Sequence, residues 1–413
     1  MAESISDPKY KVNRLAIIIA IVAVAFSIVL PIRINAIVSL TSFALCLVAN
    51  ILMKGFDISF FKTSLFILII IQSAILLLGL VQTTDLIQGY ADVERFGYAL
   101  LFPFFIYQGR RSGITVSHLM GVFTLGCVAL LLYGSAYTVL FLPNEERMKV
   151  WELGHVYFTN NFQMHPAYLS IYLILVIFFL SEILRMRQNN LTFMQIFGLG
   201  ILIVSLTVFL FFLRSQMALL TFALLSVLYI LITFKKRAWL VTFFLTTIVF
   251  LVFLLDSKRV STFFDTYGKN VSSALDNRFK VWDGAIEAIK GRPFWGSGTG
   301  SEHKALNQAY LKIGFDDGAT NSYNAHNQYL QYWIQNGIVE LAVFLTLLFY
   351  SFRQSLKSSS YTYLMFNMLM TLSMLAESCL SLHRGIVFFY FFLSAFIFLP
   401  YKSDPSSYSD PNP

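Results

Sequence analysis

Three side chains in the second half of the chain could bind or activate an anionic substrate, and Arg214 is the first of them. Residues 191–234 are almost unbroken apolar sequence, and as a single helix they would extend for about 66 Å. Because this is about twice the thickness of a bilayer's hydrocarbon core, we expect the chain to turn near the middle, at Arg214. A cation at such a turn is either an anchor at the lipid interface or a ligand for an anion.

Arg278 is the second of these side chains. Apolar residues at positions 275, 279, 282, 286 and 289 recur at helical spacing and predict an amphipathic helix over 275–290. The neighbours of Arg278 at three and four positions are not acidic, so no side chain on the same helix can neutralise its guanidinium. Its planar fork is therefore available to two phosphate oxygens, or to a tertiary salt bridge with another segment.

His326 is the third, and it lies in a polar segment that leads into an apolar run. We expect Asn324 to cap the helix that starts here, which places His326 in the first helical turn. The positive end of the helix dipole disfavours the imidazolium and attracts anions. A neutral His326 beside a bound phosphate would be a general base. The alternative is a structural histidine, hydrogen-bonded at a helix end.

For three further features of the sequence, a structural role is favoured over a functional one. Glu377 lies near the end of an apolar run and needs a partner, for which Arg384 or another arginine on the same side is a candidate. The glycine-rich segment 293–300 lacks a following Lys-Ser/Thr and a preceding strand, so a tight turn is favoured over a phosphate loop. A metal site formed by His303, His326 and the aspartates at 316 and 317 is disfavoured, since no two of them have helical i, i+4 spacing.

The composition requires these residues to be positioned by membrane helices. The 413 residues are 57% hydrophobic and only 13% charged, with a mean hydropathy of +0.68. A soluble domain carries about 25% charged residues, so a soluble enzyme is excluded. The three cysteines, Cys46, Cys127 and Cys379, form no CxxC motif, which excludes a zinc ribbon or a disulfide scaffold.

Apolar runs long enough to cross a bilayer recur along the chain and predict an all-α polytopic membrane protein with about twelve transmembrane helices. Residues 1–255 are expected to hold helices 1–9, 256–333 one large outer loop with the amphipathic helix, 334–401 helices 10–12, and 402–413 a disordered tail. The predicted spans are 14–31, 34–53, 63–82, 96–109, 114–142, 167–185, 193–213, 216–234, 238–255, 334–352, 361–380 and 385–401.

The distribution of Lys and Arg predicts the orientation. With the amino terminus in the cytoplasm, the inner segments carry more than twice as many basic residues as the short outer ones, and long loops escape this rule. Both termini are then cytoplasmic. The net charge of +8 has this topological cause, so no nucleic-acid partner is expected.

In their order and spacing, these motifs resemble the O-antigen ligase/polymerase superfamily of bacterial envelope enzymes. The resemblance covers about residues 200–400, and it departs from the pattern at Glu340, where a small residue is expected. The motifs that carry it are Leu213-Arg214-Ser215, Arg278 with Trp282, Pro293 with Gly296, Gly298 and Gly300, His326-Asn327 with Tyr329, Asn336-Gly337, Glu377, and Arg384-Gly385.

The resemblance implies a GT-C type membrane glycosyltransferase that takes a glycan from undecaprenyl diphosphate at the periplasmic face of the bacterial inner membrane. It implies that Arg214 and Arg278 bind the diphosphate and that His326 assists the acceptor hydroxyl, without a metal ion or another cofactor. The expected supporting residues are Asn327, Tyr329, Trp282, Glu377 and Arg384.

The length and the single late outer loop favour an O-antigen ligase of lipopolysaccharide biosynthesis, with lipid A–core oligosaccharide as acceptor and inversion at the anomeric carbon. An O-antigen or exopolysaccharide polymerase, or a protein O-oligosaccharyltransferase, would use the same donor with another acceptor. A lipid or sugar transporter is a more distant alternative. It is disfavoured because the notable charges cluster at the outer ends of the spans rather than at their middle.

Overall fold

The computed structural model describes residues 8–53, 55–141, 164–187, 190–213, 215–233, 268–358 and 360–401, and every regular element within these ranges is helical. The elements are α2 (Pro8–Ser27), α3 (Ile32–Leu52), η1 (Ile58–Lys62), α4 (Ser64–Gly79), α5 (Leu86–Gly109), η2 (Arg110–Ser112), α6 (Val116–Phe141), α8 (Pro166–Arg187), α9 (Phe193–Phe212), α10 (Gln216–Thr233), α13 (Gly268–Gly291), α14 (Glu302–Lys312), α15 (Asp316–Thr320), α16 (Gln328–Lys357), α17 (Tyr361–Ala376), η4 (Cys379–Ser381) and α18 (His383–Phe398).

The described helices have the architecture of a polytopic membrane protein. Each predicted span except 238–255, which lies outside the described residues, overlaps one of them. Six helices, α3, α6, α8, α9, α10 and α16, are long and apolar enough to cross a membrane, and α4 and α18 are shorter apolar helices. The expected tail 402–413 is also outside the described residues. The total of twelve spans and the GT-C type remain predictions.

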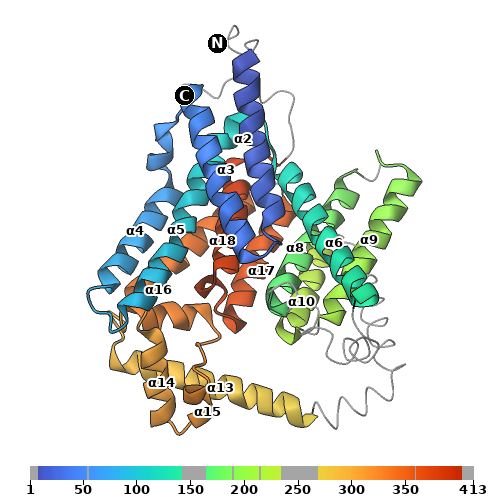
Figure 1. Ribbon diagram of the computed structural model, residues 1–413. Helices are drawn as coiled ribbons and strands as arrows, with labels where there is room; N and C mark the ends of the chain where they lie inside the picture. Colours follow the sequence, from blue (N-terminus) through green and yellow to red (C-terminus); the bar gives the residue numbers. More distant parts are fainter. Residues whose placement is uncertain are drawn as a thin grey trace.

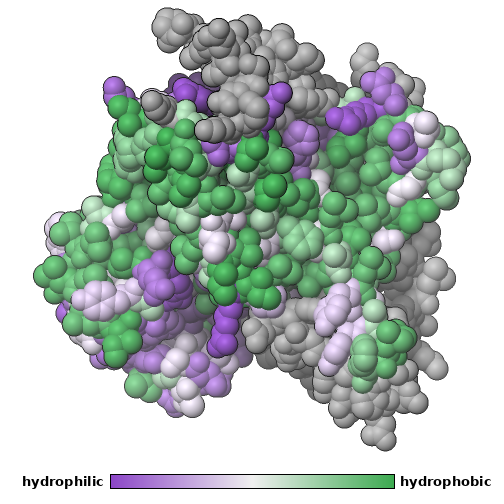
Figure 2. All heavy atoms as spheres, turned by 45° about the horizontal axis from the view of Figure 1, so that its top comes forward, coloured by the Kyte–Doolittle hydropathy of each residue, from purple (hydrophilic) through white to green (hydrophobic). Residues whose placement is uncertain are grey.

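The centre of the bundle is formed by α8 and α18, which are buried over most of their length. Both are apolar around the whole circumference, which is typical of a helix surrounded by other helices. The ring of Phe388 in α18 lies 4.6 Å from Tyr172 of α8, 5.8 Å from Phe123 of α6 and 6.0 Å from Phe366 of α17. In Figure 2 the outer surface of the described helices is mainly hydrophobic, with hydrophilic residues toward its upper and lower edges. Such a belt is the surface expected to face lipid.

A layer of shorter helices covers one end of the bundle. Helices α13, α14 and α15 lie at the bottom of Figure 1, at the opposite end from the start of α2. They share a small hydrophobic core with the start of α16. Its buried residues are Val281, Ala285, Ile289, Leu306, Tyr310, Phe315, Ala325 and Ile334.

The helix predicted over 275–290 is present within α13, but the stripe that it buries is only partly the predicted one. Ile289 of the predicted stripe is buried and Trp282 packs against the same core, together with Val281 and Ala285, whereas Phe279 and Ile286 of the predicted stripe are exposed. The reason is the close approach of α14, because a Cβ at Gly284 would collide with the ring of Tyr310. The absence of a side chain at Gly284 permits this contact.

Helix α16 is broken at Asn336 and Gly337, and the glycine-rich segment fills the break. The backbone N–H groups of Ser297 and Gly298 donate to the carbonyls of Ile334 and Gln335, both at 2.8 Å. These carbonyls belong to the turn before the break and would otherwise lack helical donors. The segment is therefore a structural turn, as its sequence favoured, and it fixes the outer layer to α16.

Glu340, the departure from the expected motif pattern, belongs to this same junction. Its carboxylate accepts a hydrogen bond from Asn336 Nδ2 at 2.9 Å, and Asn336 Nδ2 also lies 3.0 Å from Thr299 Oγ1. A longer acidic side chain in place of a small residue thus supports the broken turn of α16.

The break predicts that Gly337→Ala destabilises the protein. Gly337 has φ +74° and ψ −168°, a conformation that essentially only glycine adopts, and a Cβ there would collide with the carbonyl of Phe294. We expect a loss of at least about 1–3 kcal/mol, seen as a lower melting temperature of the purified protein in detergent. The control is Gly198→Ala in α9, where a Cβ meets open space. Equal melting temperatures for the two variants would contradict the prediction.

Candidate functional site

Three side chains from distant segments meet at the covered end of the bundle, and we call them the Arg–Glu–His cluster. Arg278 Nη2 lies 3.2 Å from Glu377 Oε1, and His326 Nδ1 lies 3.1 Å from Glu377 Oε2. Arg278 comes from α13, Glu377 follows the end of α17, and His326 precedes α16. The three side chains are 27–35% exposed, so a ligand can reach them.

The end of α17 determines the position of Glu377. The helix stops at Ala376, and Glu377 is extended, with φ −144° and ψ 143°. The carbonyls of a last helical turn have no intrahelical partner. Arg278 Nη1 donates to one of them, Ala376 O, at 2.6 Å, while its other terminal nitrogen binds the carboxylate. Arg278 therefore forms the tertiary salt bridge that was one of its two predicted roles.

The start of α16 differs from the prediction. The capping residue is Asn327, whose side chain accepts from the N–H groups of Tyr329 and Leu330 at 2.9 and 3.1 Å. Asn324, predicted as the cap, instead accepts from the N–H of His326 at 2.8 Å. His326 consequently lies before the helix rather than in its first turn. The prediction was wrong because two asparagines, both good capping residues, stand three positions apart.

His326 has a strained backbone that directs its ring toward Glu377. Its φ of +43° is in the left-handed region, which costs a non-glycine residue about 1–3 kcal/mol. Strain of this kind persists only where the surrounding structure imposes it, and it is common at functional sites. Here the hydrogen bond to Asn324 and the contact with Glu377 hold the residue on both sides.

The electrostatics of the cluster keep Glu377 ionised. Burial alone would raise the pKa of its carboxyl, but the hydrogen bond from His326 and the positive charges of His326 and Arg278 outweigh burial and lower the pKa. An ionised carboxylate can only accept, so Nδ1 of His326 must carry the hydrogen in their contact. In the neutral imidazole this leaves Nε2 as a proton acceptor.

The supporting residues predicted from the sequence have different structural roles. Tyr329 donates its hydroxyl to the carbonyl of Thr371 in α17 at 3.1 Å. Trp282 packs edge-on against Phe279, and among the described residues its buried indole Nε1 has no hydrogen-bond partner. Arg384 is buried and donates to Leu30 O at 3.0 Å, so it ties α18 to the turn after α2. The arginine that pairs with Glu377 is Arg278.

Arg214 lies outside the described residues, so its convergence with Arg278 and His326 stays a prediction. Helix α9 ends at Phe212 and α10 begins at Gln216, which confirms the turn expected in the long apolar segment.

The alternative metal site is not assembled in the described part of the chain. No three His, Cys, Asp or Glu side chains gather there in a group that could hold a metal ion. His303 lies 3.9 Å from Glu302, and Asp317 accepts hydrogen bonds from Asn321 and Tyr323.

This architecture defines a multi-pass membrane protein with an accessible ionic cluster at one end of its helical bundle. Residues 201–345 match the family model Wzy_C, described as O-antigen ligase. The match supports the resemblance to the O-antigen ligase superfamily found in the motifs, over about a third of the chain. The matched segment contains Arg214, Arg278 and His326, whereas Glu377 and Arg384 follow it. No match is found among curated proteins.

The lowered pKa of Glu377 predicts that Glu377→Gln reduces stability in a pH-dependent way. A carboxylate with a lowered pKa stabilises the folded state above its unfolded pKa of about 4.3, and this contribution is lost as the pH falls through the lower, folded value. The melting temperature of Glu377→Gln should therefore be below that of the wild type at pH 7. The difference should shrink below about pH 4.

Thermal unfolding in detergent across this pH range measures the effect. Asp283→Asn, at an exposed position on the same helix as Arg278, controls for the change in net charge. A stability difference that is constant from neutral to acidic pH would show that the ionised form of Glu377 has no stabilising role.

Proposed function

We propose that the protein is a membrane glycosyltransferase that transfers an O-antigen glycan from undecaprenyl diphosphate to lipid A–core oligosaccharide in lipopolysaccharide biosynthesis. The observation that carries the proposal is the meeting of Arg278, Glu377 and His326 in a chain of the O-antigen ligase superfamily. A cation for a phosphate and a base for a hydroxyl are the two groups that such a transfer needs.

The transfer would proceed as one displacement at the anomeric carbon. Nε2 of His326 takes the proton of the acceptor hydroxyl, the hydroxyl oxygen forms the new glycosidic bond, and the bond to the diphosphate oxygen breaks. The electron pair leaves with undecaprenyl diphosphate. Attack from the face opposite the leaving group inverts the anomeric carbon. Glu377 holds the required tautomer of His326 and stabilises the imidazolium that forms, as the carboxylate of a catalytic triad does.

The arginines would stabilise the leaving group. Arg278 uses two of its five N–H donors on Ala376 O and Glu377, so the guanidinium retains capacity for a phosphate oxygen. Arg214 would supply a second positive charge. Two guanidiniums can offset the charge that develops on the diphosphate, which is the reason to propose a reaction that is independent of a metal ion and of other cofactors.

The periplasmic face of the bacterial inner membrane is the proposed place of the reaction. Helix α2 begins and α18 ends at the end of the bundle away from α13–α15 (Figure 1). Contacts from Arg14 to Ser112 and from Val116 to Pro400 support this arrangement. Basic residues are more frequent in the segments at this end than in the short segments at the other end, which supports a cytoplasmic location for it and for both termini. The basic residues at this end include Lys11, Arg14, Arg110, Arg111, Arg185, Arg187, Arg353 and Lys357. The segment 256–333 would then be a periplasmic loop.

A reconstituted transfer assay tests the role of His326. Purified protein, undecaprenyl-diphosphate-linked glycan and lipid A–core are combined, and His326→Ala is expected to slow transfer at least about 100-fold, the lower range for loss of general-base catalysis. The matched control is His118→Ala, which removes a histidine bonded to Thr115 at the opposite end of the bundle. Full transfer by His326→Ala would remove this residue from the mechanism.

The same assay separates the arginine's role from that of a metal and identifies the acceptor. Arg278→Ala should lose transfer, while Arg278→Lys should retain part of it, because a lysine keeps the charge but not the planar fork of the guanidinium.

Transfer by the wild type should persist with excess EDTA. Complete loss with EDTA and restoration by a divalent cation would overturn metal independence. Transfer to glycan repeat units or to a protein, but not to lipid A–core, would identify a polymerase or a protein O-oligosaccharyltransferase instead.

A further inference from the structure

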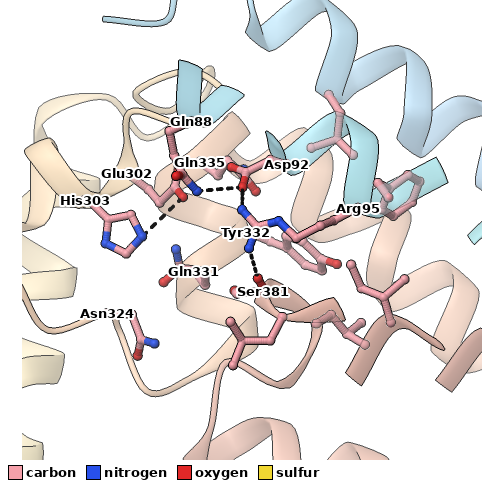
Figure 3. Close-up of a pocket in the computed structure, with 15 residues that line it drawn as sticks. Gln88, Asp92, Arg95, Glu302, His303, Asn324, Gln331, Tyr332, Gln335 and Ser381 are labelled. Atoms are coloured by element: carbon pink, nitrogen blue, oxygen red, sulfur yellow. Dashed lines mark hydrogen bonds and ion pairs between the residues drawn. The ribbon is translucent and has the colours of Figure 1, made fainter. Parts of the chain in front are cut away.

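A polar pocket lies beside the Arg–Glu–His cluster, between the start of α5, the start of α14 and the first turns of α16 (Figure 3). Its volume is about 110 Å³. One water molecule needs only about 10–15 Å³ of such space, so the pocket admits several waters or a group of comparable size. No residue of α5 or α14 was singled out as part of the site from the sequence, with the exception of His303.

One wall of the pocket is a preformed hydrogen-bond network. The carboxylate of Asp92 accepts from Gln88 Nε2 at 3.0 Å and from Gln335 Nε2 at 3.1 Å, and it is paired with Arg95. Arg95 Nη1 in turn donates to Ser381 O at 2.6 Å. These contacts fix polar side chains from α5 and α16 around the cavity without a ligand, so their geometry is set in advance.

Glu302 also lines the pocket, and Figure 3 shows this acidic side chain beside Gln88. The Glu302 side chain is only 4% exposed, and its Oε2 is buried without a hydrogen-bond partner among the described residues. Leaving such an atom unpaired costs about 1–3 kcal/mol, which a ligand or an ordered water at this position would recover. Figure 3 shows Glu302 directed to the same space as Gln88 and Gln335.

Glu302 is suited to a neutral, hydroxylated ligand. Burial, together with the nearby carboxylate of Asp92, raises the pKa of Glu302 to about 8. At neutral pH it is therefore a protonated acid, which can donate one hydrogen bond and accept others. The amides of Gln88 and Gln335 have the same double capacity. Adjacent hydroxyls of a sugar ring, each both donor and acceptor, match such a set, whereas a diphosphate would meet the Asp92 carboxylate.

We propose that this pocket binds one sugar residue of the glycan substrates. The inference rests on the proposed function, because the pocket shares two segments with the Arg–Glu–His cluster. Asn324 lines the pocket and holds the backbone of His326, and Leu380 and Ser381 line it just after Glu377. A sugar held there would position the rest of its chain relative to His326. The pocket residues are thus positioning and specificity residues and take no part in proton transfer.

Kinetics of the full-length protein with each substrate varied in turn test this proposal. Glu302→Leu and Gln88→Met remove polar groups from the pocket with little change in volume. We expect either variant to raise the KM of one glycan substrate about tenfold, as for the loss of one or two hydrogen bonds, with a much smaller change in kcat. A higher KM for the lipid-linked donor assigns the sugar to the donor, and a higher KM for the lipid A–core assigns it to the acceptor.

The controls separate a binding role from a structural one. Glu287→Leu removes a carboxylate from α13 that pairs with Lys290 and Lys312 outside the pocket, and it should leave both KM values unchanged. Glu302→Gln, which keeps two hydrogen-bonding atoms, should lie between the wild type and Glu302→Leu. If Glu302→Leu fails to fold, Glu302→Gln and Gln88→Met still decide the question. Wild-type KM values for both substrates in the pocket variants, with transfer intact, would overturn the proposal and leave the proposed function standing.

A binding measurement keeps the two proposals distinguishable. Calorimetric titration with lipid-free core oligosaccharide, and separately with lipid-free O-antigen oligosaccharide, needs no turnover. Binding of either probe that Glu302→Leu weakens supports the sugar pocket even if the wild type transfers no glycan in the assay, a result that would contradict the proposed function alone. The absence of binding by both probes, together with unchanged KM values, would contradict the pocket.

Discussion

A carboxylate held between a guanidinium and an imidazole is the interaction on which the candidate site depends. Glu377 is largely shielded from solvent, and a carboxylate in such a place is unfavourable unless charged or hydrogen-bonding partners surround it. Arg278 and His326 supply these partners, one to each carboxylate oxygen. Because the three residues come from α13, the end of α17 and the start of α16, their contacts also join the outer layer of helices to the bundle.

The fold fixes these three segments by interrupting helices at defined points. Helix α17 ends at Ala376, which exposes a carbonyl for Arg278. Helix α16 breaks at Gly337, and the glycine-rich turn supplies backbone donors at the break. This turn connects α13 to α14, so the helix that carries Arg278 is held against the helix that follows His326. The pocket lined by Glu302 and Asp92 is formed in the same junction.

The sequence predicted the parts of the fold that follow from local chemistry. Apolar runs located the described bundle helices, the length of segment 191–234 placed the turn between α9 and α10, and the absence of a P-loop pattern identified 293–300 as a structural turn. The motifs selected Arg278, His326 and Glu377 as separate candidates. An arginine partner for Glu377 was expected, but the choice of Arg278 and the contact with His326 could not be predicted, because these pairs join residues up to 99 positions apart.

The remaining differences have the same origin in three-dimensional packing. The choice between Asn324 and Asn327 as the cap depends on which backbone N–H groups face each side chain: Asn324 accepts from His326, and Asn327 accepts from Tyr329. The buried face of α13 depends on where Tyr310 packs, since its ring lies against Gly284. Asp92 and Glu302, more than two hundred positions apart, form a pocket only in the folded chain.

The central claim is that Glu377 acts on the reaction through His326, and a double-mutant cycle in the transfer assay tests it most directly. Initial rates are measured for the wild type, His326→Ala, Glu377→Gln and the double variant. Residues that act as one unit lose activity non-additively, so the account predicts that the double variant is no slower than His326→Ala alone. If the two losses multiply in the double variant, Glu377 and His326 act independently and the account is contradicted.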